Sequence, residues 1–440
     1  MMFVSLFLWA QDDDDNFAPN IQEPEKSAGF RLKNRTVELS IANISFDFTN
    51  NFIALMDIFN NPLYMILHIN DIKQDPALIY RDNIVIDVDN FFDSFRFNFN
   101  SVIKPFSFNF NKNDNWGFGF DIGHINAMGN VSVSGNVLRL KKAENEKIDA
   151  SAAVFADIGI PIFFHVNEYK IKIRPAVYLP ILYSKPSITY KNIDIGGGTY
   201  IETVYDMRVY TPVDMDNDIM QGLKDNAQDI PMNNLGYDFG LSVEYPWNYN
   251  LDIGVNIVNI PIPFATAKLH YYSQLTGYAI FDTSEIDLSE VGKENELGEE
   301  QELKDILKKT WREEHETGYR YDLDGKKIYR PFSMLFYLNY RPFDSRILSL
   351  IPSLGFSLNW LYNKIFSLEG GLSARFDFAN IFIPVLGMSY ADRKWKNSVD
   401  LAFNLRVFEL DFGFSMQSYN LLKSFKGSGL GVNFGIKLGW

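Results

Sequence analysis

Histidine, serine and glycine residues are the first places to look for chemistry in this sequence. The five histidines are His68, His124, His165, His270 and His315. None of them forms a His-x-x-x-His pair or carries a glutamate at the spacing of a zinc protease. His270 and Ser273 are close in the chain, but no motif places an acidic residue beside them to orient the imidazole. Gly196 opens a glycine triplet that lacks the Lys and Ser or Thr of a phosphate-binding loop. We therefore expect no enzyme activity, no cofactor and no metal site.

The composition narrows the class of protein further. The 440 residues include no cysteine, which excludes disulfide frameworks and thiolate metal sites. Asp and Glu number 55 against 41 Lys and Arg, so the net charge of −14 argues against a nucleic-acid partner. Hydrophobic residues make up 46% of the chain, too many for intrinsic disorder. Nevertheless, no apolar stretch approaches the roughly 18 residues that a spanning helix requires.

The elements expected to carry function are strands in which apolar and polar residues alternate, most clearly at 399–407, 410–417 and 430–440. These tracts approach the 9–11 residues with which a tilted strand crosses a bilayer. The charged residues lie on the face opposite the apolar set, together with Asn, Gln and Gly, which favours a water-facing lumen over the core of a soluble sandwich. The residues expected to face this lumen include Asp400, Asn404, Arg406, Asp411, Asn433 and Lys437.

We therefore predict an all-β fold, a transmembrane antiparallel β-barrel over residues 36–440. The best strand number is about 14 within a range of 12–18, since bacterial barrels favour even numbers. The final strand resembles the assembly signal of bacterial outer-membrane barrels through Phe434, Ile436, Leu438 and Trp440. That resemblance implies the outer membrane of a diderm bacterium as the location, with outer-membrane lipid and the barrel-assembly machinery as partners.

The N-terminal region has two parts. Residues 1–10 are apolar and precede Asp12–Asp15, which is how a signal peptide ends, although the usual basic start is missing. We interpret this stretch as a truncated signal peptide, and the alternative is an apolar first strand. Residues 11–35 are interpreted as an acidic flexible tail, since Pro19 and Pro24 disfavour regular structure.

Residues 50–93 break the alternation. Phe52, Leu55, Met56 and Phe59 follow helical spacing, and Asn61-Pro62 ends the predicted short helix. We predict a hatch or plug that enters the lumen. The alternative is a cap or arm outside the pore.

A hatch with an Asn-Pro turn beside a barrel of this size resembles the FadL-type long-chain fatty-acid transporters of the outer membrane. Their hatch carries Asn-Pro-Ala where this chain has Asn61-Pro62-Leu63. The resemblance implies uptake of a hydrophobic small molecule through the barrel, with lateral escape into the bilayer. A porin-like channel for small solutes is the alternative within the transport class.

A second departure from the strand pattern covers residues 282–327. Glu294 to Glu316 is rich in Glu and Lys, with apolar residues at helical spacing, and Asp324-Gly325 is a tight-turn signal. We predict a long charged loop that contains an exposed helix. Such loops would also suit the competing function, an adhesive or structural barrel that presents surface loops to partners.

Overall fold

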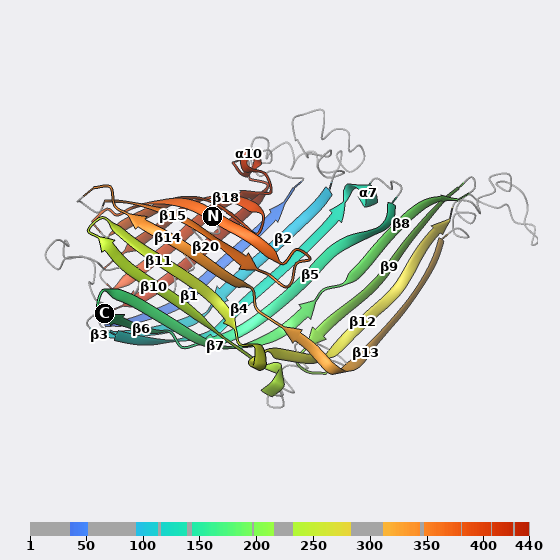
Figure 1. Ribbon diagram of the computed structural model, residues 1–440, viewed down its shortest axis with the longest axis horizontal. Helices are drawn as coiled ribbons and strands as arrows, with labels where there is room; N and C mark the ends of the chain where they lie inside the picture. Colours follow the sequence, from blue (N-terminus) through green and yellow to red (C-terminus); the bar gives the residue numbers. More distant parts are fainter. Residues whose placement is uncertain are drawn as a thin grey trace, which may run out of the picture.

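A computed structural model describes residues 36–51, 94–112, 116–138, 143–195, 198–214, 232–282, 311–343, 347–379, 381–405, 407–425 and 427–439 (Figure 1). The predicted signal peptide, the acidic tail and most of the predicted hatch lie outside these residues, and so does the C-terminal Trp440. Among the described residues no helix is both long and apolar enough to span a membrane.

The described residues form one antiparallel sheet of twenty strands. The strands are β1 (Val37–Asn50), β2 (Ser94–Lys104), β3 (Phe106–Lys112), β4 (Trp116–Ser134), β5 (Ala143–Gly159), β6 (Ile162–Val166), β7 (Tyr169–Ser184), β8 (Ser187–Ile195), β9 (Gly198–Thr211), β10 (Gly236–Asn248), β11 (Leu251–Pro261), β12 (Ala267–Asp282), β13 (Trp311–Ile328), β14 (Phe332–Tyr340), β15 (Leu348–Leu358), β16 (Phe366–Phe376), β17 (Phe382–Ala391), β18 (Lys394–Asn404), β19 (Phe408–Ser418) and β20 (Gly429–Gly439). The short helices are α7 (Gly135–Leu138), α10 (Leu421–Ser424), η1 (Met232–Asn234) and η2 (Pro263–Ala265).

The sheet closes on itself, because β1 pairs with β20 on one side and with β2 and β3 on the other. Consecutive segments often continue one another at the same place in the wall, as when β2 and β3 both lie between β1 and β4. The other such pairs of segments are β5 and β6, β7 and β8, β9 and β10, β11 and β12, and β13 and β14.

The predicted all-β, closed antiparallel barrel is confirmed. The wall contains twenty strand segments, but six pairs of them each share one place in the wall, so the strand number lies within the predicted range of 12–18 although several strands are interrupted. A proline lies in each of the six interruptions, and proline cannot donate a ladder hydrogen bond. These prolines are Pro105, Pro161, Pro186, Pro212, Pro263 and Pro331.

The two faces of the wall have opposite polarity. On the outside, Phe412 is 44% exposed and Leu368 is 60% exposed, whereas on the inside Lys437 is only 1% exposed. Buried polar residues outnumber buried hydrophobic ones among the described residues, the reverse of a soluble protein. The apolar face therefore points out of the barrel rather than into a dry core between two sheets.

The two ends of the barrel also differ. One end carries the start of β1, the end of β20 and short turns such as Asn167, whose φ of 56° allows the tight β6–β7 connection. The other end carries α7 and α10, and we call it the long-loop end. The outer parts of β8, β9, β12 and β13 extend beyond the rest of the wall there (Figure 1), and we call them the wing.

The structure bears on two of the sequence assignments, the predicted hatch and the predicted loop. Of the predicted hatch, only its first two residues are described: Asn50 ends β1, and the Asn51 side chain hydrogen-bonds Ser94, the residue that follows the predicted hatch. Both ends of that segment are thus held at the long-loop end. Within the predicted loop, residues 311–327 are β-strand, because they pair with β12 along its length, and Gly325, with φ of 67°, lies in a bulge of β13.

Candidate functional site

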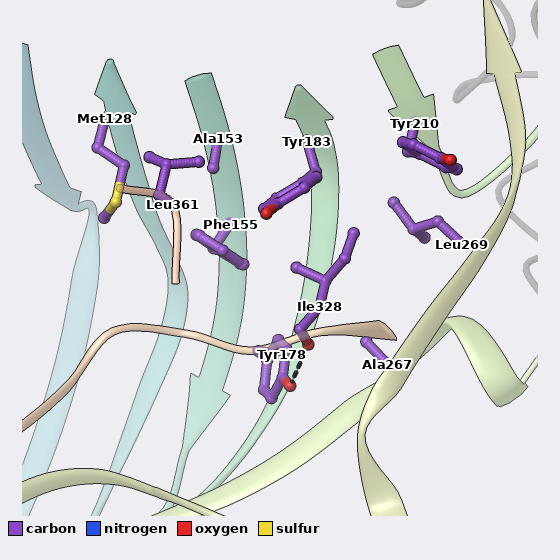
Figure 2. Packing of buried hydrophobic residues seen from close by; sticks show 10 residues of the cluster. All are labelled: Met128, Ala153, Phe155, Tyr178, Tyr183, Tyr210, Ala267, Leu269, Ile328 and Leu361. Carbon is purple, nitrogen blue, oxygen red and sulfur yellow. Dashed lines mark hydrogen bonds between the residues drawn. The ribbon is translucent and has the colours of Figure 1, made fainter. Parts of the chain in front are cut away.

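The strands β4, β5, β7, β12 and β13 are the longest of the barrel, and we call this part of the wall the long-stranded side. An apolar cluster lies on its inner face (Figure 2). We call it the aromatic cluster, and its members are Met128, Ala153, Phe155, Tyr178, Tyr183, Tyr210, Ala267, Leu269, Ile328 and Leu361, with Tyr272 and Tyr362 packed against it. Rings meet within it, as in Phe155 and Tyr178 with centroids 6.2 Å apart and Tyr210 and Tyr272 with centroids 5.2 Å apart. An apolar patch inside a lumen that is otherwise polar suits an apolar guest.

The β13–β14 junction, residues 328–331, lies across the inner side of this cluster, and we call it the crossbar. Tyr178 of β7 donates its hydroxyl to the carbonyl oxygen of Ile328 at 2.9 Å (Figure 2). In the wall, β7 and β13 are separated by the paired segments β9–β10 and β11–β12. Asn259 of β11 also donates to the carbonyl of Pro331 at 2.8 Å. The crossbar is therefore held inside the barrel instead of continuing straight along the wall.

Charged residues lie directly beneath the aromatic cluster. On β5, Ala153, Phe155 and Asp157 occupy alternate positions and are all buried on the inner face. Asp157 belongs to what we call the ion network, which consists of Asp121, His124, Asp157, Arg174, Asp238 and Arg330. The aromatic cluster and the ion network thus form two successive layers.

Arg330 of the crossbar is the centre of the ion network. Its guanidinium forms a bidentate pair with Asp238 at 2.7 and 2.5 Å and also contacts Asp157. The side chain is 5% exposed, and its guanidinium lies 5.1 Å from the centroid of the Tyr178 ring. Arg330 therefore fastens the crossbar to β5 and β10 and links the two layers.

The rest of the network ties neighbouring wall strands together. Arg174 of β7 binds Asp121 of β4 at 2.7 Å and Asp157 of β5 at 2.8 Å. His124 Nδ1 lies 2.8 Å from the other Asp157 oxygen. Removing one partner of such a buried network leaves an uncompensated charge, which is strongly destabilising.

A second inward segment lies above the crossbar. It is the β15–β16 connection, residues 359–365, which we call the cap segment. Leu361 enters the aromatic cluster, and Lys185 donates to the carbonyls of Trp360 at 3.2 Å and Tyr362 at 3.0 Å. The rings of Trp360 and Tyr329 lie 5.2 Å apart, so the cap segment also rests on the crossbar.

The cap segment is fixed on its other side by two polar residues. Asn98 of β2 donates to the Tyr362 hydroxyl at 2.8 Å and accepts from Lys394 of β18 at 2.7 Å. Together the two inward segments cover the inner side of the aromatic cluster.

The described lumen residues among those predicted lie on the opposite side of the barrel, which is built from β15 to β20 and which we call the short-stranded side. Asp400, Asn404 and Lys437 are buried, and Lys437 Nζ lies 3.2 Å from Glu409 and 3.4 Å from Asp411. Asn433 borders a small polar pocket with Asp400, Asp47 and Lys396. The structure does not describe the Arg406 side chain.

The other predicted site residues fall partly outside the described residues. Phe434 is 38% exposed on the outer face, and Ile436 and Leu438 alternate with the buried Lys437. Trp440 and the hatch residues Phe52, Leu55, Met56, Phe59, Asn61 and Pro62 are not among the residues that the structure describes.

Sequence reasoning missed the crossbar and most of the ion network. The available signal was Arg330-Pro331, a charged residue and a proline directly between two tracts with strand character. Only contacts that are distant in sequence reveal that Arg330 meets Asp157 and Asp238. The residues described in the structure contain no group of three or more His, Asp or Glu placed to hold a metal ion.

Comparisons with known proteins return structures but no sequence relatives. No family model matches the chain, and no curated protein matches it significantly. The toluene transporter TbuX of Ralstonia pickettii aligns with a TM-score of 0.41 and 7% identity, covering 94% of this chain and 92% of that one.

Two further structures are similar at the same level. The toluene transporter TodX of P. putida gives a TM-score of 0.44 at 9% identity, covering 93% of this chain and 91% of the other. A FadL homologue of Pseudomonas aeruginosa gives 0.39 at 9% identity, covering 91% and 89%. A weak resemblance to FadL-type transporters is thus found by structure as well as by sequence. At these TM-scores it assigns no function to this chain.

Proposed function

We propose that the chain is an outer-membrane β-barrel that takes up small hydrophobic solutes passively through its lumen. The membrane placement is supported by the outer face, where large apolar side chains such as Ile44, Leu354 and Phe412 are exposed on strands around the wall. In water such a surface would be an aggregation hazard, whereas in lipid it is the ordinary outer face of a barrel.

The difference between the two ends supports an orientation. Bacterial barrels have short turns on the periplasmic side and longer loops outside. We therefore assign the end with the start of β1 and the end of β20 to the periplasm, and the long-loop end with the wing to the exterior. The segment proposed as a hatch begins and ends at this exterior end, so a plug made from it would enter the lumen from outside.

The aromatic cluster is the single observation that carries the choice of cargo. A purely aqueous pore would have polar and charged residues around its whole interior. Here one side of the interior holds Phe155, Leu269 and Leu361, each no more than 3% exposed. Tyrosine rings offer flat apolar faces with a polar rim, which suits small hydrophobic or amphipathic molecules better than ions.

The crossbar and the cap segment control the access of a solute to the aromatic cluster. Both lie over the aromatic cluster, so a solute reaches the cluster only when these segments yield. The ion pairs on the opposite side, with the buried Asp400, Asn404 and Lys437, would set the electrostatic field of the remaining lumen. We further propose that β20 is read by the barrel-assembly machinery through its outward residues.

The proposal is tested by measuring entry across a lipopolysaccharide-containing outer membrane. Expression in a diderm host that lacks its own hydrophobic-uptake barrels should speed entry of the apolar dye N-phenyl-1-naphthylamine. Entry of the polar β-lactam nitrocefin, followed by periplasmic hydrolysis, should change little. A host with an empty vector is the control.

Three outcomes separate the competing functions. Faster dye entry without faster nitrocefin entry supports the proposal. Faster nitrocefin entry, together with high ion conductance in planar bilayers, supports a porin-like channel. A correctly inserted barrel that changes neither rate contradicts transport and favours the adhesive or structural alternative.

A further inference from the structure

The outer part of β13 is paired on one side only. It forms a ladder with β12 from Phe281↔Trp311 to Ala267↔Ile328, and no other described strand pairs with it. Every side chain from Arg312 to Thr317 is exposed, although these side chains point to both faces of the sheet. Charges on both faces exclude contact with lipid. A long open edge of this kind is a template for a further strand.

The symmetry of a dimer restricts how two such edges can pair. Two copies that join through the same edge are antiparallel and related by a two-fold axis perpendicular to the sheet. This axis keeps side chains on their own face, so one residue must lie opposite its own copy. Each choice of central residue fixes every other pair along the edge.

Neighbouring choices of centre bring like charges together. With Glu316 at the centre, Glu316 faces its own copy and Arg312 faces Arg320. With Gly318 at the centre, Glu314 faces Asp322. Like charges directly opposite each other destabilise an antiparallel pair.

Thr317 at the centre places no like charges opposite each other between residues 312 and 322 and brings two opposite-charge pairs together. Glu314 then faces Arg320, Arg312 faces Asp322, and Thr317 faces Thr317, a favourable cross-strand pair. Arg320 is 48% exposed and bonds Glu316 of its own strand at 2.8 Å, an exposed pair that exchanges easily for another carboxylate.

We propose that the free edge of β13 binds a second copy of this chain, antiparallel over residues 312–322 and centred on Thr317. The two-fold axis is perpendicular to the sheet and therefore also to the barrel axis. The second barrel is consequently inverted, with its long-loop end facing that of the first. The inference rests on the outer-membrane placement in the proposed function, but not on transport.

Inverted copies cannot share one membrane with the orientation that barrels have. They fit instead between two opposing outer membranes, where wings from both surfaces meet. One such contact is small and weak, but many copies on two surfaces act together and give a much higher avidity. Beside solute uptake, the chain would therefore mediate homophilic adhesion between cells or vesicles.

Charge reversal tests both the edge and the register. Glu314→Arg alone, or Arg320→Glu alone, places two like-charge pairs in each symmetric dimer and should weaken self-association roughly tenfold or more. A mixture of the two variants restores opposite charges at both positions, so the heterodimer should form. Sedimentation velocity in detergent measures this association, and clustering of proteoliposomes measures it between membranes.

Lys191→Glu is the matched control, because Lys191 is an exposed cation of the wing on β8, paired with Glu202 at 4.0 Å and away from the edge. It should leave self-association unchanged. The proposal is overturned if wild-type protein neither associates in detergent nor clusters vesicles, or if the mixture of variants fails to recover. Dimers in detergent without vesicle clustering would overturn the arrangement between opposed membranes. Dye uptake is measured separately, so failure of adhesion and failure of transport are distinguishable.

Discussion

The two sides of the barrel close the same wall but fill the interior differently. On the short-stranded side, β15 to β20 have 10 or 11 residues each. Their inner face carries small residues and ion pairs between nearby strands, such as Lys437 with Glu409 and Lys396 with Asp47. On the long-stranded side, β4, β5, β7, β12 and β13 have 16 to 19 residues.

On the long-stranded side, the inner face is covered by segments that connect strands. The aromatic cluster is covered by the crossbar, which joins β13 to β14, and by the cap segment, which comes from the short-stranded side. Arg330, Tyr178 and Lys185 hold these two segments. The short-stranded side thus forms a frame, since its ion pairs link strands that are adjacent, as with Lys437 and Glu409, or close together in the wall, as with Lys396 and Asp47. On the long-stranded side, the contacts of the crossbar and the cap segment are made by side chains and lie outside the strand ladders of the wall. This difference locates the gate of the proposed transport path.

The largest expected effect comes from removing the ion pair that holds the crossbar. Arg330→Met keeps much of the side-chain volume but leaves Asp238 without its bidentate partner. Breaking a buried pair in this way costs about 3–5 kcal/mol. We expect the free energy of unfolding in urea to fall by that amount and dye entry to rise, because the crossbar is released.

Arg320→Met is the matched control, since Arg320 is 48% exposed and its pair with Glu316 is a surface pair. Its effect on unfolding should stay within about 1 kcal/mol, with dye entry unchanged. If Arg330→Met lowers stability without any change in dye entry, the crossbar is a structural brace and not a gate.

The same comparison explains what the sequence could predict. On the short-stranded side, apolar and polar residues alternate along each strand without interruption. The sequence position alone therefore predicts that Phe412 lies on the outer face and Lys437 on the inner face. These strands pair with strands that are consecutive in the chain, so their pairing can be predicted from the sequence pattern. The barrel class and the direction of its faces followed from these strands.

The organisation of the long-stranded side could not be predicted from local sequence patterns. A bulge at Gly123, with φ of 72°, shifts the alternation between Asp121 and His124, so that both point inward. In β13 the charged, helix-like spacing of 311–316 conceals a strand whose stability comes from β12. Arg330 contacts Asp157, which is 173 residues away in the sequence, and no local pattern predicts such a contact.

A glycine substitution tests whether the inner face of the short-stranded side is tightly packed. At Gly431 an added methyl would lie 2.0 Å from the Asp47 carboxylate and 2.2 Å from the Ser415 hydroxyl, so inner-face side chains must move. We expect Gly431→Ala to cost about 1–3 kcal/mol in the free energy of unfolding. Gly370→Ala is the control, because its nearest contact would be 3.8 Å from Leu354. Equal effects of the two changes would mean that this side is not tightly packed.

The smallest expected effect separates the two fastenings of the crossbar. Tyr178→Phe removes the hydroxyl that binds the Ile328 carbonyl at 2.9 Å but keeps the ring beneath the Arg330 guanidinium. A single hydrogen bond contributes about 1 kcal/mol, so the loss in unfolding free energy should be near that value. Dye entry should rise less than in Arg330→Met, because the ion pairs still hold the segment. If Tyr178→Phe opens the path as far as Arg330→Met does, the hydrogen bond is the main latch, and the ion network serves only to join β4, β5 and β7.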